Sequence, residues 1–357
     1  MPINENAPLS VTPGAIRFNT DSMKLEYYRG GPVGFGTTTT TGEWVNLTTD
    51  SPDIQTGGTR GVFGGGFDSP LASTNIIEYI TISTTGNSQD FGDLTVNSTR
   101  AGGSGCSSST RGLFISGGSP ARNNSIEYVT ISSTGNAADF GDISYVAFYL
   151  SACASSTRGI SAGGSTSATP SGVNNIEYVT IASTGNAQDF GDLTRTSQTM
   201  SSCSSSTRGI FAGGYSPSPT LSNIIEFITF SSLGNAADFG DLTATIGYTN
   251  GGCSNSTRGL LTAGTGVTNT INYITISTLG NAQDFGDLTV ARILAAACSS
   301  PTRGVWGGGQ TPTRLNTIDY VTIMSTGNAI DFGDFTSSYS TFCSQASALS
   351  NGHGGLG

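Results

Sequence analysis

The sequence is short of charged residues, and of cations in particular. Only 11% of its 357 residues are Asp, Glu, Lys or Arg, the formal net charge is -10, and Lys24 is the one lysine. A protein that binds a phosphate backbone needs a basic stripe, so no nucleic-acid partner is expected. No run of 18 apolar residues occurs, and residues 1–10 have no cationic and apolar leader. We therefore expect neither a secretory signal nor membrane insertion.

Histidine and tryptophan are also scarce. His353 is the single histidine, and Trp44 and Trp306 are the two tryptophans. Most imidazole-based catalysis and most histidine-rich metal sites need more of these side chains. We therefore expect a non-enzymatic protein with no catalytic residues, no cofactor and no metal site. The low charge accompanies 51 glycines and regular runs of Ile, Val, Tyr and Phe, a composition that favours a folded core over disorder.

What the sequence does have is an internal repeat. Thr-Arg-Gly and Asp-Phe-Gly-Asp each occur six times, with successive copies 45 to 51 residues apart. Within one copy, four segments rich in β-branched and aromatic residues are separated by Gly, Ser and Asn, and no helical period is present. Four strands repeated six times predict an all-β, six-bladed β-propeller of four-stranded antiparallel blades, because one such sheet cannot bury both faces alone. The repeated arginines are Arg60, Arg111, Arg158, Arg208, Arg258 and Arg303, and the first aspartates are Asp90, Asp139, Asp189, Asp238, Asp284 and Asp331.

The repeat resembles the kelch family. A Gly-Gly pair follows the second predicted strand, a tyrosine lies in the third, as at Tyr128, and an aromatic residue lies in the fourth, as at Phe140. The resemblance covers roughly residues 58–347 and implies a kelch-like propeller. It departs from the family in the fourth strand, where phenylalanine stands in place of tryptophan.

A second resemblance lies in the amino-acid sequences of the repeats and of the N-terminal segment. The units, with Thr-Gly-Asn before Asp-Phe-Gly-Asp, look like virion structural proteins of tailed phages, particularly marine and cyanobacterial ones. Residues 13–20, 24–28 and 44–47 are similar to a short β-module of phage fibres. This implies a viral protein of the virion, assembled in the host cytoplasm, that serves as a tail fibre for adhesion and receptor binding or as a capsid or tail decoration. An intracellular kelch-type scaffold and, more remotely, a glycan-processing propeller enzyme are the alternatives.

Three parts are predicted along the chain. Residues 1–53 form a small N-terminal β-module that binds other virion proteins or another copy of the chain, residues 54–347 form the propeller, and residues 348–357 form a glycine-rich tail. The first repeat lacks a cysteine before Thr59, whereas Cys343 follows the last repeat. We therefore expect the strand around Cys343 to pair with the strand around Val62 and close the ring. The tail is expected to be disordered or docked on a partner, with a vestigial strand as the alternative.

The six cysteines occur once per repeat, on the strand nearest the axis in the kelch pattern. Equivalent positions in neighbouring blades are about 10 Å apart, and a disulfide needs Cα atoms within about 7 Å. Free buried thiols are therefore expected. Asn136, Asp139 and Asp142 have oxygen ligands at a spacing that suits calcium, but Asx turns that bind nearby backbone amides are the preferred interpretation.

The order of the strands assigns each turn to one of two faces. In every blade, the turn between the first and second strands and the turn between the third and fourth strands lie at the same edge, which we call the constant face. The remaining loops lie at the opposite edge, which we call the variable face. The repeated arginines and aspartates both lie toward the constant face, so we expect Arg–Asp pairs such as Arg111 with a repeat aspartate.

Binding is expected on the variable face, because its loops differ between repeats and binding residues concentrate in loops on a rigid scaffold. Its ligand is expected to be a host-surface glycan or protein. The alternative is that these loops vary because nothing constrains them. The aromatic and cationic candidates are Phe67, Tyr145, Phe148, Tyr149, Arg195, Tyr215, Tyr248 and Arg314.

Overall fold

The computed structural model describes residues 16–19, 24–29, 43–46, 59–68, 72–98, 104–118, 121–248, 251–264, 266–336 and 344–356. The chain divides into two compact units, Met1–Gln55 and Thr56–Gly357. In the first unit, the strands β1 (Ile16–Asn19), β2 (Lys24–Arg29) and β3 (Glu43–Asn46) form an antiparallel sheet in that order. Within the described part of the chain, no helix is long and apolar enough to cross a membrane.

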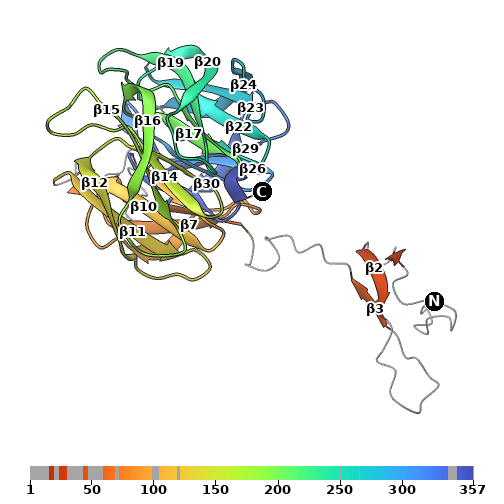
Figure 1. Ribbon diagram of the computed structural model, residues 1–357. Coiled ribbons are helices and arrows are strands. Elements are labelled where there is room, and N and C mark those ends of the chain that lie inside the picture. Colours follow the sequence, from red (N-terminus) through yellow and green to blue (C-terminus); the bar gives the residue numbers. More distant parts are fainter. Residues whose placement is uncertain are drawn as a thin grey trace. The chain divides into compact units, whose positions relative to one another are not determined.

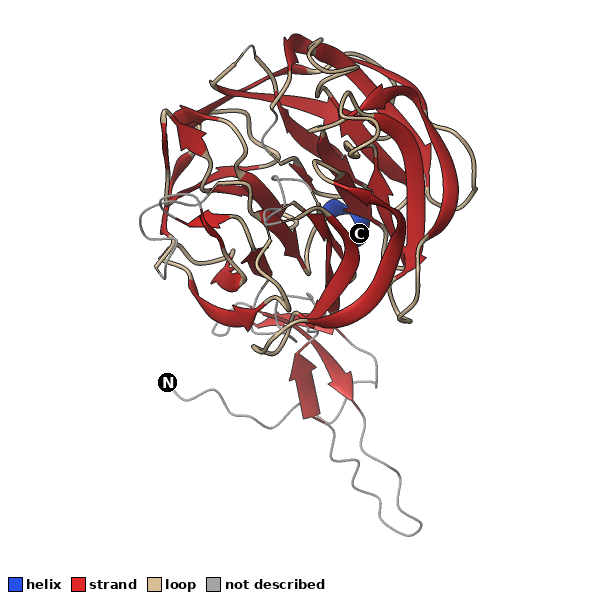
Figure 2. Ribbon diagram, turned by 90° about the vertical axis from the view of Figure 1, so that its left-hand side faces the viewer, coloured by secondary structure: helices blue, strands red, loops and turns tan. Residues whose placement is uncertain are grey.

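The second unit is a six-bladed β-propeller, as the repeat predicted (Figures 1 and 2). Each blade is a four-stranded antiparallel sheet whose first strand is innermost. The blades are, in order, β31 (Ser347–Ser350), β4 (Arg60–Gly64), β7 (Ile76–Thr81) and β8 (Gln89–Asp93); β9 (Gly105–Ser107), β10 (Arg111–Gly117), β11 (Asn123–Thr130) and β12 (Ala138–Ala147); β13 (Ser151–Ala154), β14 (Arg158–Ala162), β15 (Val173–Thr180) and β16 (Gln188–Ser197); β17 (Ser201–Ser204), β18 (Arg208–Ala212), β19 (Ser222–Thr229) and β20 (Ala237–Ile246); β21 (Cys253–Ser254), β22 (Arg258–Thr262), β23 (Thr268–Thr275) and β24 (Gln283–Arg292); β25 (Ala296–Ser299), β26 (Arg303–Gly307), β29 (Thr317–Thr322) and β30 (Ile330–Asp334). Two short hairpins, β5 (Phe67–Asp68) with β6 (Ala72–Ser73) and β27 (Gln310–Thr311) with β28 (Thr313–Arg314), lie in variable-face loops.

The C-terminal part of the chain closes the ring, but with a strand later than the expected one. Strand β31 pairs with β4, and Leu349 lies opposite Val62. In blade 2 the corresponding position, opposite Leu113, is held by Cys106. Leu349 therefore takes the place that we assigned to Cys343, which lies outside the described residues. The segment Ser347–Ser350 has the small-residue pattern of the other inner strands, with leucine in place of cysteine.

The cysteines of the inner strands pack between blades. Cys106, Cys153, Cys203, Cys253 and Cys298 are free and buried, as expected. Each sulfur lies against the glycine of Thr-Arg-Gly in the next blade, where an added Cβ would lie 2.5 to 3.0 Å from Sγ. Burial raises the pKa of Cys106 and Cys203 to about 12. These thiols are therefore protonated packing groups rather than nucleophiles.

A ring of serine hydroxyls ties the inner strands together. The Oγ atoms of Ser204, Ser254, Ser299, Ser350 and Ser107 each donate to the carbonyl oxygen at the same position in the preceding blade, over 2.6 to 2.8 Å. Blade 3 has Ala154 at this position, so the ring of hydroxyl donors is interrupted there. The carbonyl of Ser107 is consequently left for another donor.

That donor is the side chain of His353. Its Nε2 lies 2.7 Å from the Ser107 carbonyl oxygen, and its Nδ1 accepts a hydrogen bond from the Gly355 amide. The short helix η2 (Gly354–Leu356) begins directly after it, and a Cβ on Gly355 would lie 1.8 Å from the Ala154 carbonyl oxygen. The tail thus packs among the inner strands beside a cavity of about 50 Å³. The expectation of a disordered or partner-docked tail is wrong for residues 348–356.

The repeated arginines do not pair with the repeated aspartates. Each guanidinium instead lies over the third-strand tyrosine or phenylalanine of its own blade, 4.5 to 5.0 Å from the ring centroid. Each also donates to a backbone carbonyl at the end of the third strand of the next blade, as Arg111 does to Ile181 over 2.9 Å. The third strand lies between the arginine and the outer strand that carries Asp139, so that carboxylate stays exposed. The same arrangement holds for Arg60, Arg158, Arg208, Arg258 and Arg303.

The Asp-Phe-Gly-Asp motif forms the outer seam between blades. In blade 2, the Phe140 carbonyl accepts the amide of Gly185 from the next blade's third–fourth turn, and the Asp142 carbonyl accepts the amide of Ala187. The Asn186 side chain in turn accepts the Asp142 amide over 3.1 Å. The equivalent asparagine, Asn136, does the same for Asp93. This asparagine is therefore a backbone acceptor within the seam, and its partner amide lies in the preceding blade instead of in its own turn, as the Asx interpretation had expected.

Two glycines of blade 2 allow the cost of a positive φ to be measured separately from the cost of a steric clash with the next blade. Gly135 has φ +155° with nothing within 4 Å of an added Cβ, whereas Gly141 has φ +146° and its Cβ would lie 2.5 Å from the Gly185 carbonyl oxygen. We expect Gly135→Ala to lower the free energy of unfolding by about 1–2 kcal/mol and Gly141→Ala by about 1–3 kcal/mol more. Urea unfolding of both variants checks this, and equal losses would contradict the seam.

His353 makes stability depend on pH. Burial lowers its pKa from 6.5 to about 4. Between these two values the unfolded chain binds a proton that the folded chain does not, so stability falls as the pH drops through this window. We expect the wild type to be more stable than His353→Gln, and the difference between their free energies of unfolding to decrease by up to about 3 kcal/mol from pH 7 to pH 4. Thermal unfolding at several pH values measures it; a difference that is independent of pH refutes it.

Candidate binding site on the variable face

The loops that lead from one blade to the next inner strand share one backbone turn. Tyr149, Thr199, Leu294 and Gln345 precede inner strands and have φ of 58° to 62°. A positive φ is uncommon for such residues. Because it recurs in four blades, it belongs to the fold rather than to a single site.

Four of the predicted aromatic residues come together on this face. Phe148 and Tyr149 follow strand β12 in blade 2, and their ring centroids are 3.8 Å apart. Tyr248 follows β20 in blade 4, and its ring lies 6.2 Å from Tyr149 and 5.0 Å from Tyr215, which lies in the second–third loop of the same blade. We call Phe148, Tyr149, Tyr215 and Tyr248 the aromatic cluster.

The backbone beneath the cluster is held by hydrogen bonds and close contacts. The Thr199 amide donates to the Tyr149 carbonyl over 3.0 Å, and the Thr199 hydroxyl donates to the Gly247 carbonyl over 2.7 Å. A Cβ on Gly118 would lie 2.4 Å from the Phe148 ring, and one on Gly247 would lie 2.5 Å from the Tyr215 ring. The rings therefore rest on bare backbone, and the loops of blades 2, 3 and 4 are joined to one another.

The tyrosine hydroxyls of the cluster influence one another. Burial, followed by the neighbouring Tyr248, raises the pKa of Tyr149 to about 12, while Arg122 opposes this shift. Burial and Tyr248 also raise the pKa of Tyr215. These hydroxyls are therefore protonated near neutral pH and can donate hydrogen bonds. Arg122, which the sequence analysis did not single out, is the cation beside them, and its Nη1 donates to the Ser165 carbonyl over 3.3 Å.

Phe67 and Arg314 meet elsewhere on this face. The guanidinium of Arg314, in β28, lies 4.8 Å from the ring centroid of Phe67, in β5. The two residues belong to loops of blades 6 and 1, and the Phe67 amide donates to the Ser344 carbonyl. This contact joins the loops on either side of the ring closure.

Tyr145 and Arg195 are not loop tips. They lie in the long outer strands β12 and β16, which extend farther than the sequence suggested. The Tyr145 hydroxyl donates to the Gly163 carbonyl over 2.9 Å. Arg195 Nη2 donates to the carbonyls of Gly213 and Ile224 over 3.3 and 3.1 Å. Both side chains therefore serve contacts between blades.

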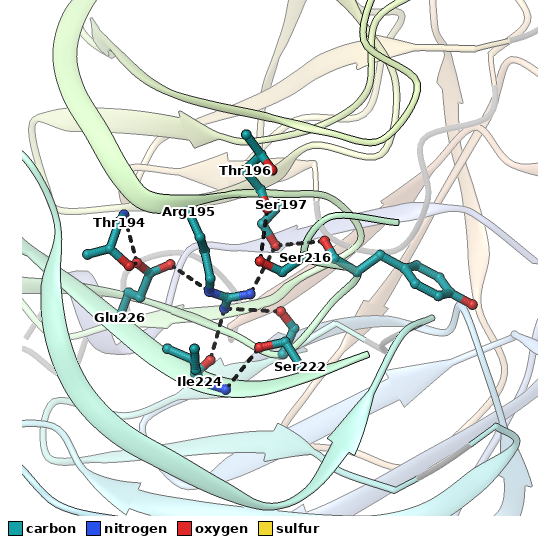
Figure 3. A network of polar contacts seen from close by, with 10 residues as sticks. Thr194, Arg195, Thr196, Ser197, Ser216, Ser222, Ile224 and Glu226 are labelled. Atoms are coloured by element: carbon teal, nitrogen blue, oxygen red, sulfur yellow. Dashed lines mark hydrogen bonds and ion pairs between the residues drawn. The ribbon is translucent and has the colours of Figure 1, made fainter. Parts of the chain in front are cut away.

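Figure 3 shows the network around Arg195, whose guanidinium points toward Glu226. Arg195 Nε lies 3.4 Å from Glu226 Oε2, and the side chains are 12% and 0% exposed. Burial lowers the pKa of Arg195, and Glu226 opposes this. The other Glu226 oxygen accepts the amide and the hydroxyl of Thr194.

The Glu226 position is a buried polar group in every blade. Its occupants accept from a threonine or serine at the end of the preceding blade's outer strand, as Glu127, Glu177, Asn272 and Asp319 do from Thr95, Ser144, Thr243 and Thr289. Glu78 accepts instead from the Ser88 hydroxyl over 2.7 Å. The repeated acid before the third-strand tyrosine was visible in the sequence, but its burial between blades was not predicted.

The described residues hold no group of three His, Cys, Asp or Glu side chains that could bind a metal ion. No protein-family model matches the chain, and no curated protein matches it either. On the described variable face, the aromatic cluster with Arg122 combines four aromatic rings with hydrogen-bonding groups, and it is the candidate binding site.

The two sides of blade 4 suggest a test of the buried pair. In blade 5, Asn272 occupies the position that Glu226 occupies in blade 4. Its threonine partner, Thr243, is followed by Ala244 instead of an arginine. Arg195→Ala alone leaves a buried carboxylate oxygen without its partner, and we expect a loss of about 3 kcal/mol in unfolding free energy. Adding Glu226→Gln imitates the Ala244–Asn272 combination and should recover about 1–2 kcal/mol. Chemical unfolding measures both, and additive losses would contradict the coupling.

Proposed function

We propose that the protein is a non-enzymatic, kelch-like virion protein of a tailed phage whose variable face binds a glycan or protein on the host surface. The observation that carries the proposal is the aromatic cluster. Tyrosine and phenylalanine side chains combine apolar area with polar edges, and they are enriched where proteins bind their ligands. A rigid ring that gathers such residues from several blades suits adhesion.

The setting in a virion rests on the resemblance of the repeats and of residues 13–47 to phage structural proteins. The first unit has a three-stranded sheet of short strands, and such a sheet is marginal on its own. It gains stability when it binds another virion protein or a second copy of the chain. The free thiols are consistent with assembly in a reducing host cytoplasm.

Capsid or tail decoration is the second candidate function, and one observation favours it. Leu233, Leu279 and Met324 lie in third–fourth turns on the constant face of blades 4, 5 and 6, and they are 56%, 59% and 57% exposed. Large exposed apolar side chains in the corresponding turns of three consecutive blades suggest a contact surface. A decoration protein would present this face to the particle.

The two candidates differ in the face they need. We compare full-length chains carrying Phe148→Ala with Tyr248→Ala against chains carrying Leu279→Ala with Met324→Ala, in a binding assay on marine cyanobacterial cells. Adhesion through the variable face predicts at least a tenfold loss for the first pair, which removes the exposed ring of Tyr248 and the half-buried ring of Phe148, and unchanged binding for the second. Equal binding by both variants removes the adhesion proposal and leaves the structural role.

A further inference from the structure

The rings of the aromatic cluster offer a stacking surface with polar edges. Tyr248 is 39% exposed, and its ring plane is inclined by 80° to Tyr215 and by 58° to Tyr149. The three rings therefore face in different directions instead of forming one flat platform. The electron-rich face of a tyrosine attracts the weakly positive C–H groups of a sugar ring, and the hydroxyl at its edge binds the hydroxyls of that sugar.

The charge beside the cluster is positive in a protein whose net charge is -10. Within the described part of the chain, Arg122 forms no ion pair, and its one hydrogen bond is to the Ser165 carbonyl. Two arginines of the outer strands, Arg195 and Arg292, are by contrast neutralised by Glu226 and Asp319. Arg122 is thus a cation with further N–H groups that can donate hydrogen bonds. A guanidinium binds carboxylate or sulfate groups through bidentate hydrogen bonds.

Taken with the proposed function, on which it rests, this arrangement defines the ligand. We infer that the aromatic cluster and Arg122 together bind an acidic saccharide, with the sugar ring against Tyr149 and Tyr248 and the anionic group on Arg122. A single-stranded nucleic acid also has stacking rings and anions. Proteins that bind such a strand provide a basic groove along its backbone, whereas Arg122 is the one cation described beside the cluster, so oligo(dT) is included in the test as the competing ligand.

The test uses the full chain and four defined polymers. Polygalacturonate supplies carboxylates, dextran sulfate supplies sulfates, dextran is the neutral polysaccharide, and oligo(dT) represents a single-stranded nucleic acid. Binding is measured by titration calorimetry at low and at physiological salt. We expect one of the acidic polysaccharides to bind at least tenfold more tightly than dextran, and the comparison of the two identifies the anionic group.

Three variants assign that binding to the site. Arg122→Gln should reduce the preference for the acidic polymer about tenfold, toward the affinity for dextran, because it removes a charge-assisted hydrogen bond. Tyr248→Ala should weaken the acidic and neutral polymers alike. Arg17→Gln, in the first unit, is the control that removes the same charge elsewhere and should bind as the wild type does.

Several results would overturn the inference. These are equal affinity for dextran and both acidic polymers, an unchanged preference in Arg122→Gln, an equal loss of preference in Arg17→Gln, and binding of oligo(dT) alone. If cell binding is lost in the Phe148→Ala with Tyr248→Ala chain while no acidic polymer is preferred, adhesion stands and the saccharide assignment fails. If an acidic polymer is preferred but cell binding is unchanged in that chain, the site stands and adhesion through it fails.

Discussion

The outer seam between neighbouring blades is the contact on which the arrangement of the ring depends. The turn between the third and fourth strands of one blade is hydrogen-bonded to the outer strand of the preceding blade. In blade 3, backbone amides of this turn and the side chain of Asn186 bind Phe140 and Asp142 of blade 2. This fit requires a backbone without Cβ at Gly141. Because the same fit recurs around the ring, each repeat keeps Asp-Phe-Gly-Asp and Thr-Gly-Asn or Leu-Gly-Asn together, and the angle between blades is set locally rather than by a shared core.

The seam also explains why the two faces of the propeller differ. Turns on the constant face bind neighbouring blades: Arg111 of blade 2 reaches the next blade and Asn186 of blade 3 reaches the preceding one, so the sequences of these turns are restricted by packing. Loops on the variable face differ in length and residues from blade to blade, although bridges such as that of Phe148 with Ser165 recur between their described parts. That freedom allows Tyr149 and Tyr248, which are far apart along the chain, to meet near Arg122.

Much of this fold is predictable from the sequence because the repeat period and the strand pattern are strong local signals. The register of the closing strand was missed because Leu349 replaces the cysteine that marked the other inner strands. The Arg–Asp pairs were wrong because charge alone does not show that a backbone carbonyl of the next blade lies closer, as Ile181 does to Arg111. Tyr145 and Arg195 were placed in loops because the ends of β12 and β16 carry no sequence marker. The aromatic cluster depends on loop conformations, which composition does not encode.

The pairing of β31 with β4 links residues that are almost the whole length of the propeller apart in sequence. During synthesis on the ribosome, blade 1 has no innermost strand until residues 347–350 have been made, and until then the edge of β4 offers unsatisfied hydrogen-bonding groups to any other chain. Blades 2 to 6 obtain all four of their strands in order as the chain emerges. The folding order is therefore fixed by topology: five blades wait for a late segment, and a chain interrupted before it carries an open, aggregation-prone edge.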